Sequence, residues 1–447
     1  MKLAKIEGKK HYMPDRSPSQ SPEEIRLSVG LASVDITPEI GVPLAGFGGR
    51  RRRVIPWDVP NRYPYATFLK PSTGILDPIR AKAMILKTGN DMLFFLSLDL
   101  VAVTAKIVGD IHARIKHLGF SENEIFISAT HTHSGPGTLS RNQFWQAAAS
   151  DKFQQQIYER FLDGVQTTIQ RAHATLTEAS LFAASFKTED LQRNRRGRKG
   201  HFDSEANLLL AKSKKGQWLG GLVNLAIHGT ALDAGNSQFS ADVPGAIENA
   251  LAKKLRAENA APDAAEAVIL FLNGAEGDVA PMRGGVEGMN KIGADFAQQA
   301  QPALKNLRPI SPEWKAHSTE IHLGAAGVGA RNCVDNDAWS WFVPGWYRLS
   351  LIKKMPQKTR IWNLRLGDMI FLTWPGEPTT AFGLEIKNLA TTAGFKQAWI
   401  LGLTNDYLAY FTTPSEYDEG GYEACGTLYG REGGSKILKA HKTMAGL

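Results

Sequence analysis

The stretch ISATHTHSGPG, Ile127–Gly137, places two histidines where an apolar segment gives way to a Gly-Pro-Gly turn. The preceding residues, EIFISAT, predict a short buried β-strand that ends just before His131. Side chains at positions i and i+2 of an extended backbone point to the same side, so His131 and His133 are predicted to face one pocket. Histidine is the commonest metal ligand near neutral pH, and the pair therefore marks a candidate site for metal binding or proton transfer.

Polar side chains follow other apolar segments in the same way. The segments AIHGT, AVILFLNGAEGDVAP, WPGEP and TNDYLAYF carry, in chain order, His228, Asp278, Glu377, Asn405, Tyr407 and Tyr410. Open α/β sheets usually build their sites at the carboxyl ends of strands, so these positions are predicted to converge. Either both imidazoles of the pair bind a metal, or one binds while the other handles protons; His228 as a third ligand and a carboxylate from Glu377 would give a zinc-like set that still admits water. Zinc lowers the pKa of such water enough to make it a nucleophile near neutral pH.

The chain as a whole alternates between predicted strands and helices. Hairpins are predicted at Gly89-Asn90, Lys215-Gly216 and Gly367-Asp368, because each pair lies between two apolar segments. Helices are predicted near 104–119, 151–176, 243–257, 290–305 and 378–393, the first with Thr104 as a cap and Gly119 as a stop. This pattern predicts a mixed α/β fold in which twisted, mostly buried sheets are flanked by helices.

Composition limits the class of protein. The 447 residues carry a formal net charge of +8, and two basic clusters, Arg50–Arg53 and Arg193–Lys199, are predicted to be solvated loops or anion-steering patches. No nucleic-acid-binding module accompanies them, so nucleic acid is not an expected partner. Two cysteines, Cys333 and Cys425, are too few for a disulfide framework and are predicted to be free thiols.

The N-terminal segment is polar and rich in Ser-Pro, and residues 1–27 are predicted to form a flexible arm. It lacks the apolar region of a signal peptide, and the chain has no apolar run of membrane-spanning length. A cytoplasmic protein is therefore expected, with the mature form of a secreted protein as the alternative.

Several of these segments resemble one known family. SATHTHSGPG is similar to the most specific motif of the neutral/alkaline ceramidase family. The resemblance continues in order over about residues 28–435, through SVDITP with LAGFG, NRRG, AIHGT, SADVPG, NGAEGDVAP, PGEPTT and TNDYLAYFTTPSEYDEGGYEACGTLYG. The resemblance implies a zinc-dependent amidase that cleaves the N-acyl bond of ceramide.

The resemblance also implies a role for individual residues. The implied zinc ligands are His131, His228, Glu377 and Tyr410. His133 is implied as the acid/base next to the metal-activated water, while Arg195 and Tyr422 are implied to line the substrate site and act in catalysis, with Gly46 beside them.

The chain departs from the family pattern at two points. Ala280, in GDVAP, occupies a substrate-site position where the family has serine. The family's C-terminal immunoglobulin-like domain has no counterpart, so residues 28–447 are predicted to be a catalytic domain alone. The amidase chemistry is expected to be retained on a substrate whose amine half differs from a sphingoid base.

Two aromatic segments, 51–78 and 339–349, are interpreted either as a lid or acyl-chain groove with peripheral membrane contact, or as loops packed on the body. The predicted function is hydrolysis of a lipid-like N-acyl amide, a small-molecule substrate, by metal-activated water. The alternatives are a TIM-barrel amidohydrolase that cleaves a non-lipid amide and a non-catalytic metal-binding relative. The sequence leaves the oligomeric state open.

Overall fold

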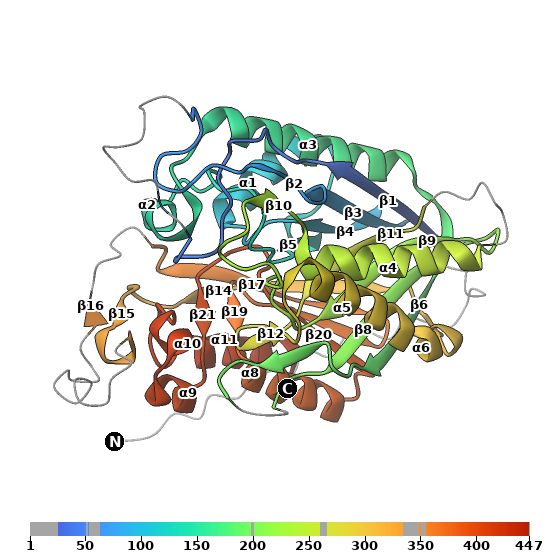
Figure 1. Cartoon of the computed structure of the whole chain (residues 1–447). Helices are drawn as coiled ribbons and strands as arrows, with labels where there is room; N and C mark the ends of the chain where they lie inside the picture. The colour runs from blue at the N-terminus through green and yellow to red at the C-terminus, as the bar shows by residue number, and fades with distance from the viewer. Residues whose placement is uncertain are drawn as a thin grey trace, which may run out of the picture.

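The structure, a computed structural model, describes residues 26–50, 52, 63–197, 201–259, 266–333, 348–349 and 355–446. It has the predicted mixed α/β architecture, with helices on the outside and sheets within (Figure 1). The predicted arm lies almost entirely outside these ranges. Residues 51 and 53–62 of the first aromatic segment and residues 339–347 of the second also lie outside them. No helix among the described residues is both long and apolar enough to cross a membrane.

The largest sheet has nine strands in the order β11-β9-β8-β6-β1-β3-β4-β5, with β13 paired to β6. Most neighbours are antiparallel, but β4 with β5 and β9 with β11 are parallel. The bounds are β1 Leu27–Asp35, β3 Arg80–Thr88, β4 Asp91–Leu98, β5 Ile125–Ala129, β6 Thr177–Lys187, β8 Glu205–Ser213, β9 Trp218–Leu225, β11 Val268–Asn273 and β13 Arg308–Ile310. This arrangement of the described strands contradicts the alternative of a TIM barrel, which needs a parallel barrel.

A second sheet has four strands in the order β14-β17-β18-β20. Their bounds are β14 Trp314–His322, β17 Lys358–Leu366, β18 Met369–Thr373 and β20 Gln397–Leu401. The three predicted hairpins are confirmed, since they join β3 to β4, β8 to β9 and β17 to β18.

Alternation along the strands explains why the two sheets face each other. In β4, Phe94 and Leu96 pack under helices, whereas Leu93 and Phe95 belong to a different core. That second core also contains Phe371 of β18, so it fills the space between the large and the small sheet. Both faces of these strands are buried, which is why their sequences are continuously apolar.

Helices cover the outer faces of both sheets (Figure 1). The helices α1 and α3 pack on the β1-β3-β4-β5 part, α4 and α5 on β8, β9 and β11, and α8 and α11 on the small sheet. The bounds are α1 Ala105–Ile115, α2 Gln143–Trp145, α3 Gln155–Ala174, α4 Asp242–Glu258, α5 Gly285–Gln299, α6 Gln301–Lys305, α8 Thr380–Thr392, α9 Pro414–Glu419, α10 Tyr422–Cys425 and α11 Gly433–Ala445.

Short elements connect these layers and carry much of the site. Three pairs of two- or three-residue strands join distant segments: β7 Gln192–Asn194 with β12 Val279–Pro281, β19 Glu377–Pro378 with β21 Tyr410–Phe411, and β2 Gly74–Ile75 with β10 Gln238–Phe239. A fourth pair is β15 Val328–Gly329 with β16 Arg348–Leu349. The short helices are η1 Lys116–Leu118, η2 Glu122–Glu124, η3 Gln146–Ser150 and η4 Ala330–Cys333.

Two predictions from composition are wrong. Cys333 and Cys425 form a disulfide, because η4 and α10 lie side by side although 92 residues separate the cysteines in sequence. Arg50 is buried rather than solvated, since its guanidinium donates to the backbone oxygens of His133 and Asn236. Neither contact is visible in the local sequence.

Candidate active site

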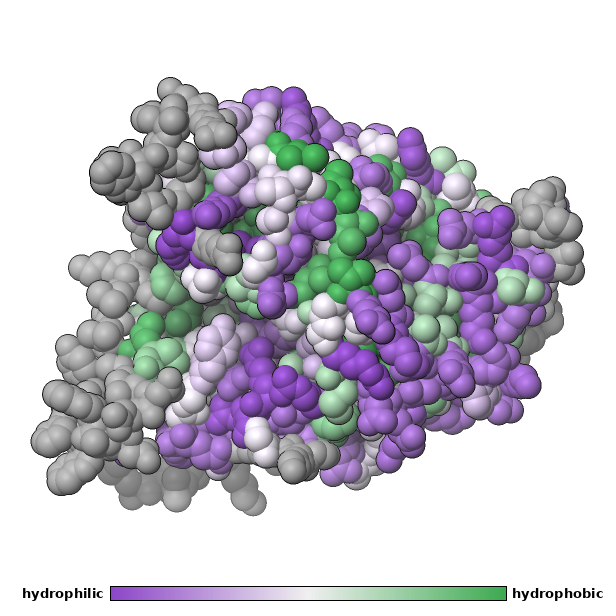
Figure 2. Space-filling view, viewed as in Figure 1, coloured by the Kyte–Doolittle hydropathy of each residue, from purple (hydrophilic) through white to green (hydrophobic). Residues whose placement is uncertain are grey.

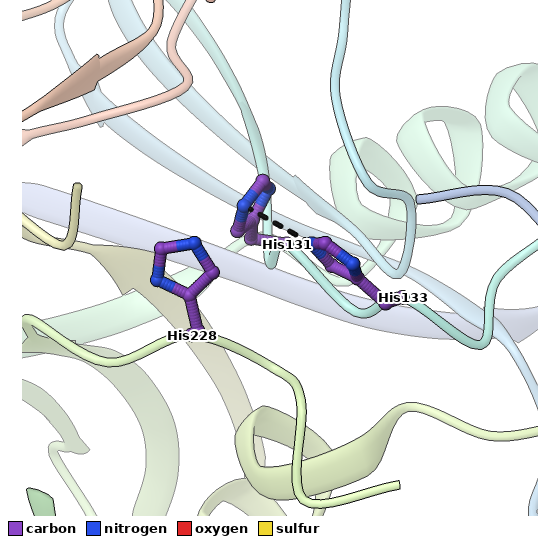
Figure 3. A group of neighbouring side chains, drawn as sticks. All are labelled: His131, His133 and His228. Atoms are coloured by element: carbon purple, nitrogen blue, oxygen red, sulfur yellow. Dashed lines mark hydrogen bonds between the residues drawn. The ribbon is translucent and has the colours of Figure 1, made fainter. Parts of the chain in front are cut away.

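The site begins where β5 ends. His131 follows this strand with a φ of 68°, in the left-handed region, so the predicted extended geometry is wrong at this residue. The two imidazoles nevertheless meet, because the Nε2 atoms of His131 and His133 lie 3.3 Å apart (Figure 3). His133 is held by its backbone N–H, which donates to the oxygen of Gly229 at 3.0 Å.

His228 reaches the same point from the end of β9 (Figure 3). Its Nδ1 lies 2.9 Å from the oxygen of Val279, and Nδ1 of His131 lies 2.6 Å from the oxygen of Val101. A carbonyl oxygen can only accept, so Nδ1 carries the proton in both rings. In the neutral form of each ring, Nε2 is then the atom with a free electron pair for a metal, the orientation that outer hydrogen bonds give to metal-binding histidines.

Glu377 supplies a carboxylate to these imidazoles. Its Oε2 lies 3.3 Å from Nε2 of His131 and 3.2 Å from Nε2 of His228, while Oε1 accepts from the Tyr407 hydroxyl at 2.6 Å. Oε2 is fully buried and, with both imidazoles neutral, has no hydrogen-bond donor within the described part of the chain. Three electron-pair donors thus converge on one point.

Glu276 is a second carboxylate at this point, and the sequence analysis did not select it. It follows β11 in the segment that contains Asp278 and is completely buried, and no described residue makes a hydrogen bond to either of its carboxylate oxygens. One of its oxygens lies within 4.8 Å of ligand atoms of His131 and Glu377. Burial and the charge of Glu377 raise the pKa of Glu276 well above its ordinary value.

The donor set fits a metal ion. His131, His133 and His228 form one group of mutually close ligand atoms, and His131 with the two glutamates forms another. Two buried carboxylates are costly unless a cation or a bound proton neutralises them. Nitrogen and oxygen donors of this kind suit zinc and related divalent metals.

Tyr410 and Arg195 complete the inner site. The short pair of β19 with β21 aligns Glu377 with Tyr410, which explains why two residues 33 positions apart share one site. Arg195 donates to the Tyr410 hydroxyl at 3.0 Å and to Nε2 of His228 at 3.2 Å, and Glu423 anchors it at 2.7 Å. Burial and nearby Glu377 raise the pKa of Tyr410 well above its ordinary value.

Tyr422 lies at the edge of the site. Its side chain is 67% exposed, and its ring makes an edge contact with that of Tyr410, with the centroids 5.6 Å apart. The Arg195 guanidinium lies 5.3 Å from the centre of the Tyr422 ring. The resemblance-based residues Arg195 and Tyr422 are therefore brought together with the predicted ligands.

Gly46 makes room for the ring of His133. Gly46 has a φ of 111°, and a Cβ atom there would lie 2.6 Å from Cγ of His133. Only glycine therefore allows this ring to lie so close to the loop. Burial and the neighbouring His131 lower the pKa of His133 well below 6.5, and burial lowers that of His228 to about 4.

Two cavities meet at this cluster and share Gly48, His133, Tyr410 and Tyr422. The first, of about 250 Å³, is lined mainly by apolar side chains between α1, α2 and α10, including Leu100, Ile107, Leu139, Phe144, Trp145 and Leu428. Figure 2 shows hydrophobic residues in this region, between the upper and lower parts of the molecule. The second cavity is lined by Ala280 together with three arginines.

Two of the predicted strand-end residues are structural. Asp278 accepts from Asn194 and from the backbone and hydroxyl of Thr380, so it joins loops behind the cluster. Asn405 bonds to the backbone at Ile125 and Ile127 of β5 and fastens the small sheet's exit to the histidine-bearing strand. The end of a strand therefore carries residues that only connect loops as well as candidate ligands.

Comparison with known proteins agrees with this geometry. The chain matches the family described as neutral/alkaline non-lysosomal ceramidase, N-terminal, over residues 60–298 and 349–438. It is 23% identical to neutral ceramidase of Mycobacterium tuberculosis, over 91% of this chain and 74% of that protein. It is 24% identical to neutral ceramidase of Pseudomonas aeruginosa, over 74% of this chain and 60% of that protein.

Solved structures show the same fold. The crystal structure of the Pseudomonas aeruginosa enzyme superimposes with a TM-score of 0.79 at 20% identity, over 95% of this chain and 74% of that one. A second structure, described as ceramidase complexed with C2, gives a TM-score of 0.78 at 19% identity over 95% of this chain and 76% of that one. From the sequence match over most of its length, the chain belongs to the neutral/alkaline non-lysosomal ceramidase family, whose members are hydrolases that act on the amide bond of ceramide.

Proposed function

We propose that this protein is a zinc-dependent hydrolase that cleaves the amide bond of an N-acylated, ceramide-related lipid. The observation that carries the proposal is the convergence of the Nε2 atoms of His131 and His228 with the buried Oε2 of Glu377 at the inner end of an apolar cavity. Family membership supports the amidase chemistry, and the names of the relatives support a lipid amide as substrate.

The proposed zinc ligands are His131, His228, Glu377 and Tyr410. The bound metal supplies a Lewis acid that polarises the amide carbonyl and lowers the pKa of water. The chain itself holds the ligands in place, through Val101 and Val279 behind the imidazoles and Tyr407 behind the carboxylate. Glu276 adds a further buried carboxyl group, whose ionised form a cation at this point would stabilise.

His133 is proposed to move the proton. Its lowered pKa keeps the ring neutral near pH 7, so Nε2 can accept a proton from the attacking water. The ring can then deliver this proton to the nitrogen of the leaving amine. Gly46 and the backbone of Gly229 hold the ring close to His131, where this transfer is needed.

Arg195 and Tyr422 are proposed to stabilise the negative charge that develops on the amide oxygen. Arg195 is 22% exposed at its side chain and positioned by Glu423, so its guanidinium is fixed before substrate binds. Tyr422 is exposed at the mouth of both cavities and carries a hydroxyl that can donate to the same oxygen. The apolar cavity is proposed to take the acyl chain.

Elemental analysis of the purified protein tests the metal. We expect about one tightly held zinc per chain, and loss of that metal in His131→Ala and in His228→Ala, because each removes a ligand. His117→Ala, at an exposed histidine of η1, is the matched control and should keep the metal. Metal-free wild-type protein that still hydrolyses N-acyl amides after strong chelation would contradict the proposal.

A further inference from the structure

The second cavity at the metal cluster has a chemistry different from the first. It has a volume of about 700 Å³ and is lined by Arg193, Arg195 and Arg283, with Asp233 as its one acidic side chain among the described residues. The apolar cavity can hold a single hydrocarbon chain, but the second cavity presents an excess of positive charge. A sphingoid base would place another long alkyl chain there.

Among these three arginines, Arg193 has the guanidinium group with the fewest hydrogen-bond and ion-pair partners. The side chain is exposed, and no hydrogen bond or ion pair to it is found within the part of the chain that the structure describes. Arg195, in contrast, is bound by Glu423, and Arg283 donates to the backbone oxygen of Asp190 and lies 3.6 Å from Asp295. The guanidinium of Arg193 therefore remains available to bind a ligand.

Ala280 allows a ligand to reach this group. The strands β7 and β12 pair so that Ala280 lies directly opposite Arg193, and both residues line the cavity. Opposed residues of an antiparallel pair share one face of the ladder, so the small methyl group lies beside the base of the arginine side chain. A planar guanidinium fork matches a carboxylate geometrically, which makes Arg the residue of choice for such groups.

The cavity geometry points to a carboxylate on the amine half of the substrate, and we propose that this protein hydrolyses N-acyl amino acids. The inference rests on the proposed function, because the scissile amide has to lie at the shared residues His133 and Tyr410. The acyl chain lies in the apolar cavity and the amino-acid carboxylate pairs with Arg193. Water adds to the carbonyl carbon, the C–N bond breaks, and the nitrogen takes the proton, giving a fatty acid and an amino acid.

The zinc-loaded full chain is tested on substrates with one acyl group: N-lauroylglycine, its neutral amide N-lauroylglycinamide, and N-lauroylsphingosine. We expect kcat/KM for the carboxylate to exceed that for either neutral substrate by about tenfold or more, mainly through KM, as for a charge-assisted pair. Arg193→Gln should bring the ratio of carboxylate to neutral amide close to one. Arg171→Gln removes the same charge from an exposed position on α3 and should leave the ratio unchanged.

The outcomes separate this inference from the proposed function. Hydrolysis of N-lauroylsphingosine or of the neutral amide at least as well as N-lauroylglycine would overturn the inference and leave the amidase proposal standing. A ratio unaffected by Arg193→Gln would overturn the assigned role of Arg193. Failure of the zinc-loaded protein to hydrolyse any of the three would contradict the proposed function itself.

Discussion

His131 shows how much of the site one residue's conformation decides. Its positive φ turns the ring away from the direction of β5, and the oxygen of Val101 then fixes which nitrogen carries the proton. Positive φ costs a non-glycine residue about 1 kcal/mol or more, and such strain persists where the surrounding structure enforces it. Here the surrounding hydrogen bonds direct Nε2 of His131 toward Glu377.

His133 differs from its neighbour because Nδ1 has no hydrogen-bond partner within the described part of the chain. We expect His133→Ala to keep zinc and fold, yet to lose roughly 10²- to 10⁴-fold in turnover, the usual effect of losing a general acid/base. Elemental analysis and steady-state kinetics on one protein preparation measure both quantities. Normal turnover in this variant would show that the ring takes no part in proton transfer.

Ala280 is the residue at which the chain departs from the family pattern. Ala280→Ser adds a hydroxyl beside Arg193 in the second cavity, and we expect it to shift preference toward ceramide by about 1–3 kcal/mol in relative kcat/KM. Competition between ceramide and N-lauroylglycine measures the shift, with zinc content as the control. An unchanged ranking of the two substrates would refute a specificity role for this position.

At the scale of elements, the strand ends carry the proposed ligands and the helices hold the strands in place. A buried cluster of Lys82, Asp99 and Glu248 connects β3 to α4. The ammonium group of Lys82 lies 3.1 Å from the carboxylate of Asp99 and 2.6 Å from that of Glu248. Glu248 also accepts from the backbone of Phe271 in β11. One lysine thus ties three elements together beneath the site.

Lys82→Met should lower the free energy of unfolding by about 3–5 kcal/mol, because it leaves two carboxylates buried without their cation. Urea denaturation at pH 8 measures this loss. The double variant Lys82→Met with Glu248→Gln is the control and should recover part of it, since one of the two charges is gone. A decrease of less than about 1 kcal/mol in the free energy of unfolding of Lys82→Met would show that water reaches Asp99 and Glu248 in solution.

The same group predicts a dependence on pH. Burial raises the pKa of Glu248 to about 7, above its ordinary 4.5, so the folded protein binds a proton more readily than the unfolded chain between these values. Lowering the pH through that window therefore favours folding through this group. The penalty of Lys82→Met should accordingly be smaller at pH 5.5 than at pH 8.

At the scale of the molecule, the core between the two sheets sets the distance between β5, β11 and β18, whose exits carry His131, Glu276 and Glu377. The disulfide Cys333–Cys425 adds a constraint at the outer side, because Cys425 belongs to α10 and lines the apolar cavity. Tyr422 lies on the same short helix.

Replacing both cysteines by serine should lower the free energy of unfolding by about 2–4 kcal/mol and raise KM, because α10 loses its covalent anchor. Denaturation and kinetics of the double variant measure the two effects. Peptide mass spectrometry without reduction should find the two cysteines in one cross-linked species. Rapid alkylation of both thiols in the folded wild-type protein would contradict the pairing.

The sequence by itself determined most of the elements and the residues proposed as ligands. Hydrophobic periodicity is a local property, so it located the hairpins, the longer α-helices other than α11, and the strand ends that carry His131, His228 and Glu377. Tyr410 required the family resemblance, because its spacing alone is also typical of a core residue.

Only the tertiary structure decided the remaining features, since each depends on residues distant in sequence. Glu276 has no hydrogen-bond partner among the described residues. Arg50 is buried, and its guanidinium donates to the backbone oxygens of His133 and Asn236. Cys333 meets Cys425 only when η4 packs on α10. The charge of the second cavity likewise arises where β7 pairs with β12. Local sequence records neither contact nor burial, and these two decide whether a polar residue is a ligand, a brace or part of the solvated surface.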